Sequence, residues 1–319
     1  MATEPIFINT RCIAPAAAGK HRLPSGVSKP AAISDYWALT KPEVNFLIAI
    51  ATVTGFYLGC PRQLDLFPWP RLVHSLLGTL LVASGTGTLN QYIERRFDAQ
   101  MRRTARRPLA AGRLKSSAVL WFGVTLSAMG SIYLAIAVNM LASLLAIATL
   151  LSYLFLYTPL KRKTPLCVLV GAFPGAMPPL IGWAAAVGAV SLQALVISAS
   201  LFLWQFPHFM AIAWMYREDY ARASYLVLPC ENQGRFVAWV TALPTLGLVI
   251  LGLVPTPLAR AGPFCRIGVL LLSSALVYFG AQLGLRRSTV AARRLLRASI
   301  VYLPLVFVLR VADRLLSSS

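Results

Sequence analysis

The amino-acid sequence predicts an all-α, polytopic membrane protein, and three observations support this fold class. The chain of 319 residues is 57% hydrophobic and 13% charged, whereas soluble domains carry about 25% charged residues. Its mean hydropathy is +0.67. Apolar stretches of about 20 residues recur along the chain, and a helix of that length spans ~30 Å of hydrocarbon. We therefore expect one bundle of nine transmembrane helices.

The start of the chain differs from the rest. Residues 1–34 are rich in Ala, Pro and Gly, contain scattered basic residues and lack the hydrophobic core of a signal peptide. We expect a disordered basic arm in the cytoplasm, followed by a single transmembrane domain over residues 35–319. A mitochondrial presequence is the competing interpretation, because the arm is basic and poor in acidic residues, but the arm shows little amphipathic periodicity.

Nine hydrophobic spans follow the arm. They cover residues 44–58, 72–90, 118–137, 140–157, 166–187, 192–215, 236–254, 267–285 and 298–316. The fifth span contains Pro174, Pro178 and Pro179, so we expect its helix to be interrupted. The ninth span is the least regular, because charged residues lie near its end.

Arginine and lysine residues are unevenly distributed among the loops. The loops after the second, fourth, sixth and eighth spans are strongly basic, and the other loops are short or carry few charges. The positive-inside rule then places the N-terminus and the basic loops in the cytoplasm and the C-terminus on the opposite side. The net charge of +20 therefore indicates orientation and contact with membrane lipid, and no nucleic-acid partner is expected.

Three oxygen-bearing side chains mark the end of the second span. Asn90, Glu94 and Asp98 are spaced i, i+4 and i+8, so a continuing helix places them on one face. Acidic groups at a membrane boundary are costly unless compensated, which makes them functional candidates. Two carboxylates and an amide oxygen suit Mg²⁺, which usually adds substrate phosphate and water. The alternative is a solvated helix end whose carboxylates pair with Arg95 or Arg102.

A second polar group of residues lies at the end of the sixth span. On a continuous helix, His208 and Asp219 are close to three turns apart and share a face, unless Pro207 kinks the helix. Asp219 is a second candidate cation ligand, whereas Glu218 and Arg222 are spaced to pair with each other. Three roles are open for His208: a proton carrier, a ligand to a metal in the substrate, or a satisfied polar residue of the bundle.

The two acidic groups lie at the cytoplasmic ends of different spans. Together they are suited to hold a diphosphate between two Mg²⁺ ions. Nearby basic residues, among them Lys161 and the arginines between 102 and 107, would neutralise the leaving group. Arginine does so through bidentate contacts and lysine as a point charge. The sequence therefore predicts phosphate chemistry at a membrane surface.

These residues resemble a known pattern. Asn90-x-x-x-Glu94-x-x-x-Asp98 is similar to the first acidic motif of the UbiA superfamily of intramembrane prenyltransferases, although aspartate is common at the position of Glu94. Longer strings resemble one family within it, the protohaem IX farnesyltransferases (haem O synthases). They are Asn-Gln-Tyr-Ile-Glu-Arg at 90–95, Tyr-Thr-Pro-Leu-Lys-Arg at 157–162, Pro-Pro-Leu-Ile-Gly-Trp at 178–183, Trp-Gln-Phe-Pro-His-Phe at 204–209 and Arg-Glu-Asp-Tyr-Ala-Arg at 217–222.

The resemblance implies a nine-helix fold of the UbiA prenyltransferase type with a cavity that opens laterally to lipid. It implies Mg²⁺-dependent transfer of a farnesyl group from farnesyl diphosphate to a vinyl group of haem B, with water addition, giving haem O for haem–copper oxidases. Asn90, Glu94 and Asp98 would bind one Mg²⁺–diphosphate, and Asp219 would serve a second metal site. The implied substrate-binding residues are Arg102, Arg106, Lys161, His208, Arg217 and Arg222.

The resemblance also implies a location and partners. It places the protein in a bacterial inner membrane, with the mitochondrial inner membrane as the alternative, and a downstream haem A synthase or oxidase assembly factor as partner. Two other functions stay open. A related prenyltransferase acting on a quinone precursor would need no iron-porphyrin cavity. An ion-coupled transporter would use Glu94, Asp98 and His208 for coupling, but such groups are expected near the bilayer midplane.

Overall fold

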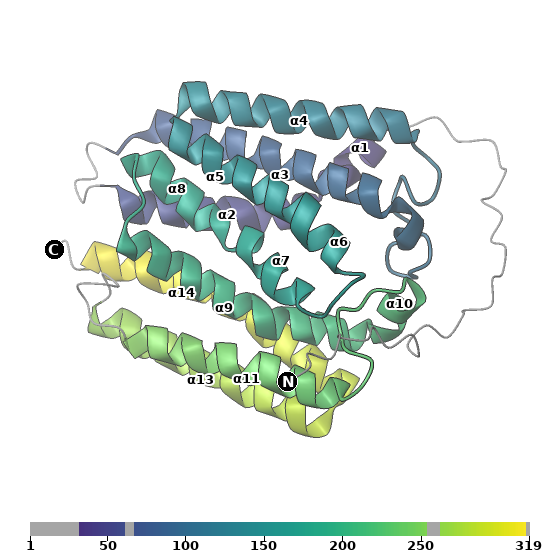
Figure 1. Ribbon diagram of the computed structural model, residues 1–319. Coiled ribbons are helices and arrows are strands. Elements are labelled where there is room, and N and C mark those ends of the chain that lie inside the picture. Colours follow the sequence, from purple (N-terminus) through teal and green to yellow (C-terminus); the bar gives the residue numbers. More distant parts are fainter. Residues whose placement is uncertain (1–31, 61–66, 254–261, 317–319) are drawn as a thin grey trace, which may run out of the picture.

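The computed structural model describes residues 32–60, 67–253 and 262–316, which form helices and contain no strand (Figure 1). In chain order the elements are α1 (Ile33–Leu39), α2 (Pro42–Gly59), α3 (Trp69–Asp98), α4 (Ser116–Ala137), α5 (Met140–Leu151), the π-helix η3 (Ser152–Tyr157), α6 (Thr158–Leu160), α7 (Cys167–Gly175), α8 (Met177–Val187), α9 (Leu192–Met215), α10 (Arg217–Arg222), α11 (Gln233–Leu253), α13 (Pro263–Arg286) and α14 (Thr289–Leu316). Within the described residues, nine helical stretches are long and apolar enough to cross a membrane. The predicted fold class and number of spans are confirmed.

Some helices extend beyond the predicted apolar spans. α3 continues past residue 90 to Asp98, and α14 begins at Thr289 instead of residue 298. Hydropathy marks only the part of a helix that lies in hydrocarbon, whereas a helix satisfies its own backbone groups and can continue beyond it. The extension of α3 forms the helical face that was predicted for its three polar side chains.

The fourth and fifth spans are irregular. α5 passes into the π-helical turn η3, and the fifth span is split into α7 and α8 at Ala176, as its prolines predict. Proline disturbs the backbone hydrogen bonds of a helix, and side chains of α9 donate to backbone carbonyls before and at this break. Gln205 Nε2 donates to Ala172 O at 3.0 Å, and the Ser198 hydroxyl donates to Ala176 O.

α2 and α8 pack with their backbones in close contact. Most of α8 is buried. A Cβ atom added at Gly55 would overlap the carbonyl of Pro179, and one added at Gly182 would overlap the carbonyl of Thr52. Small residues allow such close approach between helices in membranes, where dispersion contacts take the place of a hydrophobic driving force.

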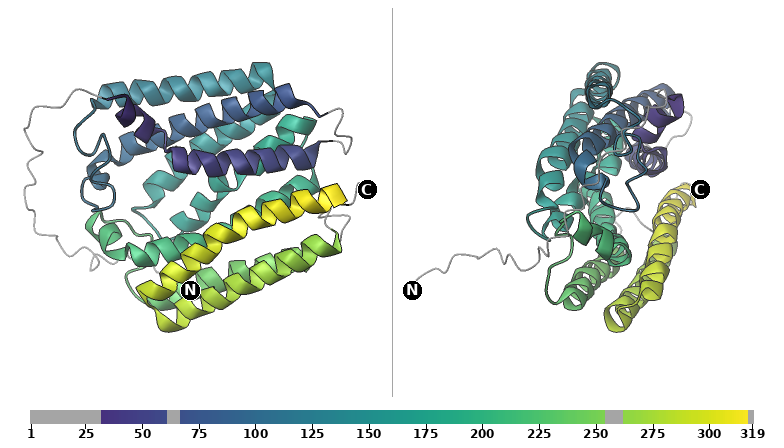
Figure 2. Two further views of the ribbon diagram at one scale, coloured as in Figure 1. Left: turned by 180° about the vertical axis from the view of Figure 1, so that it is seen from behind. Right: turned by 90° about the vertical axis from the view of Figure 1, so that its right-hand side faces the viewer.

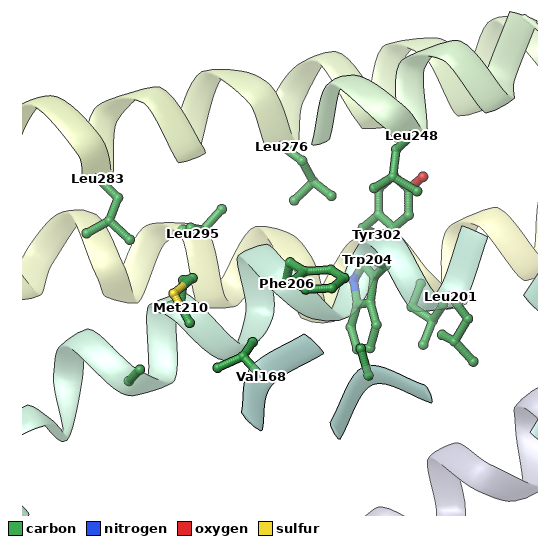
Figure 3. Close-up of a cluster of buried hydrophobic side chains, with 14 of the residues drawn as sticks. Val168, Leu201, Trp204, Phe206, Met210, Leu248, Leu276, Leu283, Leu295 and Tyr302 are labelled. Atoms are coloured by element: carbon green, nitrogen blue, oxygen red, sulfur yellow. The ribbon is translucent and has the colours of Figure 1, made fainter. Parts of the chain in front are cut away.

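Two clusters of buried apolar side chains meet at α9. One lies between α2, α3, α4, α5, α8 and the first turns of α9, and the other between α7, α9, α11, α13 and α14. In the second cluster, Trp204 and Phe206 of α9 lie among Leu248, Leu276 and Tyr302 (Figure 3). Large apolar side chains such as Ile136 and Leu285 are exposed on the outer faces, as expected for contact with lipid.

The basic loops identified in the sequence lie at one end of the bundle, on the right in Figure 1. The end of α3, α6 and α10 lie there, and the view from behind shows α1 and the start of α2 at the same end (Figure 2). The charge asymmetry of the sequence is therefore an asymmetry of the folded molecule. The predicted arm, residues 1–34, lies outside the described residues up to residue 31, and α1 begins at Ile33.

Candidate active site

α3 carries three polar side chains at the end of the bundle where the basic loops lie. Asn90, Glu94 and Asp98 share one face of its last turns, as their spacing predicts, and are 1%, 5% and 1% exposed. Burying polar groups and charges is costly unless they are hydrogen-bonded and paired. Their surroundings therefore determine what they can do.

Both carboxylates on α3 pair with a basic residue of a later segment. Lys161 Nζ lies 2.7 Å from Glu94 Oε1, and Arg107 Nη1 lies 2.7 Å from Asp98 Oδ2. Burial disfavours the charged amine of Lys161, but the Glu94 carboxylate outweighs it and holds the pKa of Lys161 well above its usual range. The site therefore combines buried negative and positive groups within hydrogen-bonding distance.

The amide of Asn90 also has a cation beside it. Lys41 Nζ donates to Asn90 Oδ1 at 3.0 Å, and Asn90 Nδ2 donates to Thr158 Oγ1 at 3.3 Å. The π-helical turn positions Thr158, whose hydroxyl donates to Tyr153 O at 2.8 Å. Burial, together with the nearby guanidinium of Arg107, lowers the pKa of Lys41 to about 7. The positive charges at this site are crowded together.

The helix that carries His208 does not continue to Asp219. α9 ends at Met215, and the backbone of Tyr216 departs from helical geometry with φ −109° and ψ 22°. The shared face was expected only on a continuous helix, and this condition is not met. Pro207 is not the cause, because it lies inside α9. The break places Asp219 in the separate short helix α10.

α10 brings Asp219 against the loop that follows α3. The buried carboxylate accepts a hydrogen bond from the backbone N–H of Arg103 at 3.3 Å and one from Arg222 Nη1 at 3.1 Å. Arg222 also lies 3.9 Å from Glu218, which confirms the predicted pairing of these two residues. The contact with Arg103 therefore joins α10, which carries Asp219, to the loop that follows Asp98.

Asp98 Oδ1 is a buried polar atom that has no hydrogen-bond partner among the described residues. Burial, with the Glu94 carboxylate nearby, raises the pKa of Tyr225. In the described part of the chain, no three His, Cys, Asp or Glu side chains form a metal-binding group by themselves. An open carboxylate oxygen beside basic groups suits a cation that binds together with phosphate, as Mg²⁺ usually does.

Other predicted substrate-binding residues do not join these ion pairs. Arg102 and Arg106 are exposed, and Arg217 Nη1 donates to Trp214 O at 3.1 Å at the end of α9. Among the arginines at 102–107, Arg107 is the one that pairs with the Asp98 carboxylate of α3. The alternative of a solvated helix end paired to Arg95 or Arg102 does not describe this arrangement, because both carboxylates on α3 are buried.

His208 lies inside α9, away from the ion pairs. Its ring stacks on Trp204 with 4.8 Å between centroids, and its Nδ1 lies 2.9 Å from Ser299 Oγ. The Ser299 hydroxyl donates to Leu296 O at 2.7 Å, and its oxygen lies beside the ring of His208. A neutral Nδ1–H tautomer of His208 would donate to that oxygen and keep a lone pair on Nε2. No described residue donates a hydrogen bond to Nε2.

Two residues of this site, Lys41 and Tyr225, are absent from the set predicted from the sequence, and Arg107 is predicted only as one member of the arginine run at 102–107. A weak signal existed for Lys41, because a Lys-Pro pair stands at the start of the first span. Arg107 belongs to the same arginine run as Arg102 and Arg106. Local sequence does not distinguish its members, because the path of the loop decides which of them reaches Asp98.

The bundle of the described helices and this cluster of buried charged and polar side chains define an integral membrane protein with a polar site at one end of the bundle. The sequence matches the model of the UbiA prenyltransferase family over residues 48–303. The chain belongs to this family, as its acidic motif predicts.

Curated relatives resemble the chain over most of its length. It is 45% identical to the protoheme IX farnesyltransferase of Solibacter usitatus, over 88% of this chain and 98% of the relative. It is 40% identical to that of Koribacter versatilis, over 91% and 97%. The mitochondrial protoheme IX farnesyltransferase of Arabidopsis thaliana is 36% identical over 84% of this chain and 62% of the relative.

Solved structures share the fold at low sequence identity. Digeranylgeranylglyceryl phosphate synthase superposes with a TM-score of 0.73 at 15% identity, over 88% of this chain and 98% of that one. A UbiA homolog from Archaeoglobus fulgidus bound to GPP and Mg²⁺ has a TM-score of 0.59 at 15% identity, over 87% and 99%. These likenesses confirm the predicted fold type, and neither they nor the curated relatives favour the transporter alternative.

Proposed function

We propose that the protein transfers a farnesyl group from farnesyl diphosphate to a vinyl group of haem B, with addition of water, to give haem O. The observation that carries this proposal is the buried row of Asn90, Glu94 and Asp98 with its basic partners, at one end of a nine-helix bundle. Relatives with up to 45% identity are named protoheme IX farnesyltransferases, which supports farnesyl diphosphate and haem B as the substrates.

We also propose that the reaction depends on Mg²⁺. Asn90, Glu94 and Asp98 would hold one ion, and Asp219 would contribute to a second. The free Asp98 Oδ1 supports this assignment, as does the family relative from Archaeoglobus fulgidus bound to GPP and Mg²⁺. Bound Mg²⁺ neutralises charge on a diphosphate and so makes it a better leaving group.

The basic residues would hold the diphosphate while the bond between farnesyl C1 and oxygen breaks. Lys161 and Arg107 adjoin the ligands on α3, so the diphosphate would leave with the bonding electron pair into a positive environment. Arg222, Arg102 and Arg106 remain proposed phosphate contacts.

The allylic cation would then be attacked by the terminal carbon of the haem vinyl group, forming a carbon–carbon bond. Water would add to the cation beside the porphyrin ring and lose a proton. Keeping water away until that step protects the farnesyl cation from hydrolysis.

His208 favours haem over a phenolic acceptor. A neutral imidazole is the commonest metal ligand in proteins, and a ligating histidine usually donates its other N–H to an oxygen acceptor. Ser299 would supply that acceptor, which would leave Nε2 for the iron. His208 lies about 10 Å along α9 from Met215, a depth that suits a porphyrin held further into the membrane than the diphosphate. A quinone-ring precursor contains no metal and needs no such ligand.

Haem extraction tests the proposal. Wild type, Asn90→Ala and Asp219→Ala are expressed in membranes that contain haem B but lack haem O, and Glu43→Ala, an exposed acidic residue of α2, serves as control. We expect haem O from wild type and from the control, and a loss of about a hundredfold or more from the two variants. Folded wild type without haem O would refute the function, and full activity in either variant would refute its magnesium role.

We further propose that the protein lies in a bacterial cytoplasmic membrane with its N-terminus in the cytoplasm. The bacterial relatives support the kind of membrane. The basic end of the bundle supports the orientation. A haem A synthase or an oxidase assembly factor would then receive the haem O that is formed.

A further inference from the structure

We propose that Lys41 binds the diphosphate of the prenyl donor, and that its hydrogen bond to Asn90 is exchanged for that anion when the metal–diphosphate binds. This inference rests on the proposed function. It adds a residue from the turn before the first span to a site whose other predicted members lie on later segments. Three observations carry it: the charges at the site, the construction of the turn that holds Lys41, and the acceptor that its amine uses.

The charges at the site do not balance. Three basic residues, Lys41, Lys161 and Arg107, lie beside two carboxylates. Glu94 pairs with Lys161, and Asp98 pairs with Arg107. Among the described residues, Lys41 forms no ion pair, and its amine donates to the neutral amide of Asn90. The surplus positive charge is therefore at Lys41, and an anion is the group that would compensate it.

The turn between α1 and α2 is fastened to α3 on both sides of Lys41. Gln91 Nε2 donates to Leu39 O at 3.0 Å, and Asn45 Nδ2 donates to Thr40 O at 3.0 Å and to Ser84 Oγ at 2.7 Å. Polar side chains of α2 and α3 thus fix the backbone that precedes Lys41, so the position of its amine is set by the fold.

The backbone of Lys41 itself is unusual. It lies in the left-handed region, with φ 54° and ψ 62°, which non-glycine residues adopt rarely. Pro42 follows, and a residue before proline is disfavoured in right-handed helical geometry. The lysine stem then runs along Gly87 of α3, where an added Cβ would lie 3.4 Å from Lys41 Cδ. These features direct the amine towards Asn90.

The acceptor explains the exchange. Asn90 is a proposed metal ligand through the same Oδ1 atom that accepts from Lys41. When a cation takes that oxygen, the lysine loses its acceptor and is repelled by the cation. A diphosphate oxygen bound to the same metal would then be the nearest strong acceptor for a charged amine.

Calorimetric titration of the full-length protein with inorganic diphosphate and Mg²⁺ tests this inference without haem. Lys41→Met is expected to weaken binding by about tenfold or more, since it removes a charged hydrogen bond. Lys41→Arg should stay within about threefold of wild type, because it keeps the charge. Lys115→Met, which removes an exposed lysine at the same end of the bundle, should bind as wild type does.

Two outcomes separate this inference from the function on which it rests. If wild type binds Mg²⁺–diphosphate and Lys41→Met binds it equally well, Lys41 only supports the turn and the inference fails alone. If wild type does not bind Mg²⁺–diphosphate, the proposed function fails as well. Lys41→Gln, which keeps a donor without the charge, gives the same comparison if the Met variant does not fold. Haem absorbance should be unchanged in every Lys41 variant.

Discussion

Single residues at the active site are arranged as oppositely charged or hydrogen-bonded pairs. Glu94 with Lys161 and Asp98 with Arg107 are largely buried ion pairs. Such pairs add little stability, because desolvation offsets their attraction, yet removing one partner is strongly destabilising. We therefore explain these pairs by binding and not by stability: their carboxylates could separate from the basic partners to bind a cation.

Arg107→Leu is expected to lower the free energy of unfolding by roughly 3 kcal/mol, because it leaves the Asp98 carboxylate buried and unpaired. The double variant Arg107→Leu with Asp98→Leu should recover most of that stability and still form no haem O. Thermal unfolding in detergent and haem extraction measure the two effects. An Arg107→Leu variant as stable as wild type would show that the pair does not compensate the buried charge.

Ser299→Ala is expected to weaken haem binding by about tenfold, because it removes the oxygen that would accept from the Nδ1–H tautomer of His208. His208→Ala should abolish axial ligation, seen as a shifted Soret band, and leave Mg²⁺–diphosphate binding unchanged. Ser273→Ala, another buried hydroxyl on a neighbouring helix, is the control. Unaltered haem spectra in Ser299→Ala would show that the contact between Ser299 and His208 is not needed for haem binding.

At the scale of whole elements, the irregular helices position the site. The π-helical turn η3 places Thr158 beside Asn90, and the break after α9 turns Asp219 towards the loop after α3. π-Helical turns inside α-helices occur frequently at functional sites. The contact between α2 and α8 is regular and lies away from these polar side chains. It holds the first span in place through two glycines.

Gly182→Ala is expected to lower the free energy of unfolding by about 1–3 kcal/mol, because the added methyl group overpacks the contact with α2. The sign is diagnostic, since glycine to alanine inside a helix otherwise stabilises by about 1 kcal/mol. Thermal unfolding followed by tryptophan fluorescence measures it. Val44→Leu on the exposed face of α2 should have no effect, and a more stable Gly182→Ala would contradict the close contact.

At the scale of the whole molecule, one end of the bundle carries both the basic loops and the active site (Figure 1). The same charges can therefore orient the protein in the membrane and attract an anionic substrate. The exposed apolar side chains cover the outer faces between the two ends. We therefore expect a single charge distribution to influence both the orientation of the protein and the access of its substrate.

Alkaline phosphatase fusions in a bacterial host test this orientation. A fusion after Leu316 is expected to be active, because nine spans place the C-terminus opposite the basic end. A fusion after Arg287 should be inactive, and one after Asn139, at the other end of the bundle, should be active. The reverse pattern would place the active site outside the cytoplasm.

Much of this arrangement could be predicted from the sequence. The number of spans, the interruption of the fifth span and the shared face of Asn90, Glu94 and Asp98 depend on hydropathy, proline and helical spacing. Each of these is a property of contiguous residues, so a local pattern contains it. Whether the helix of His208 continues to Asp219 could not be decided in this way, because the break at Tyr216 has no such local marker.

The sequence by itself thus determined the class of protein, the family motif and the oxygen-bearing side chains that we propose as ligands. Only the tertiary structure decided which cation meets each ligand: Lys41 lies 49 residues from Asn90, and Lys161 lies 67 residues from Glu94. It also placed His208 within hydrogen-bonding distance of a serine on α14. Such pairings depend on the paths of loops and the packing of distant helices, which no short-range pattern specifies.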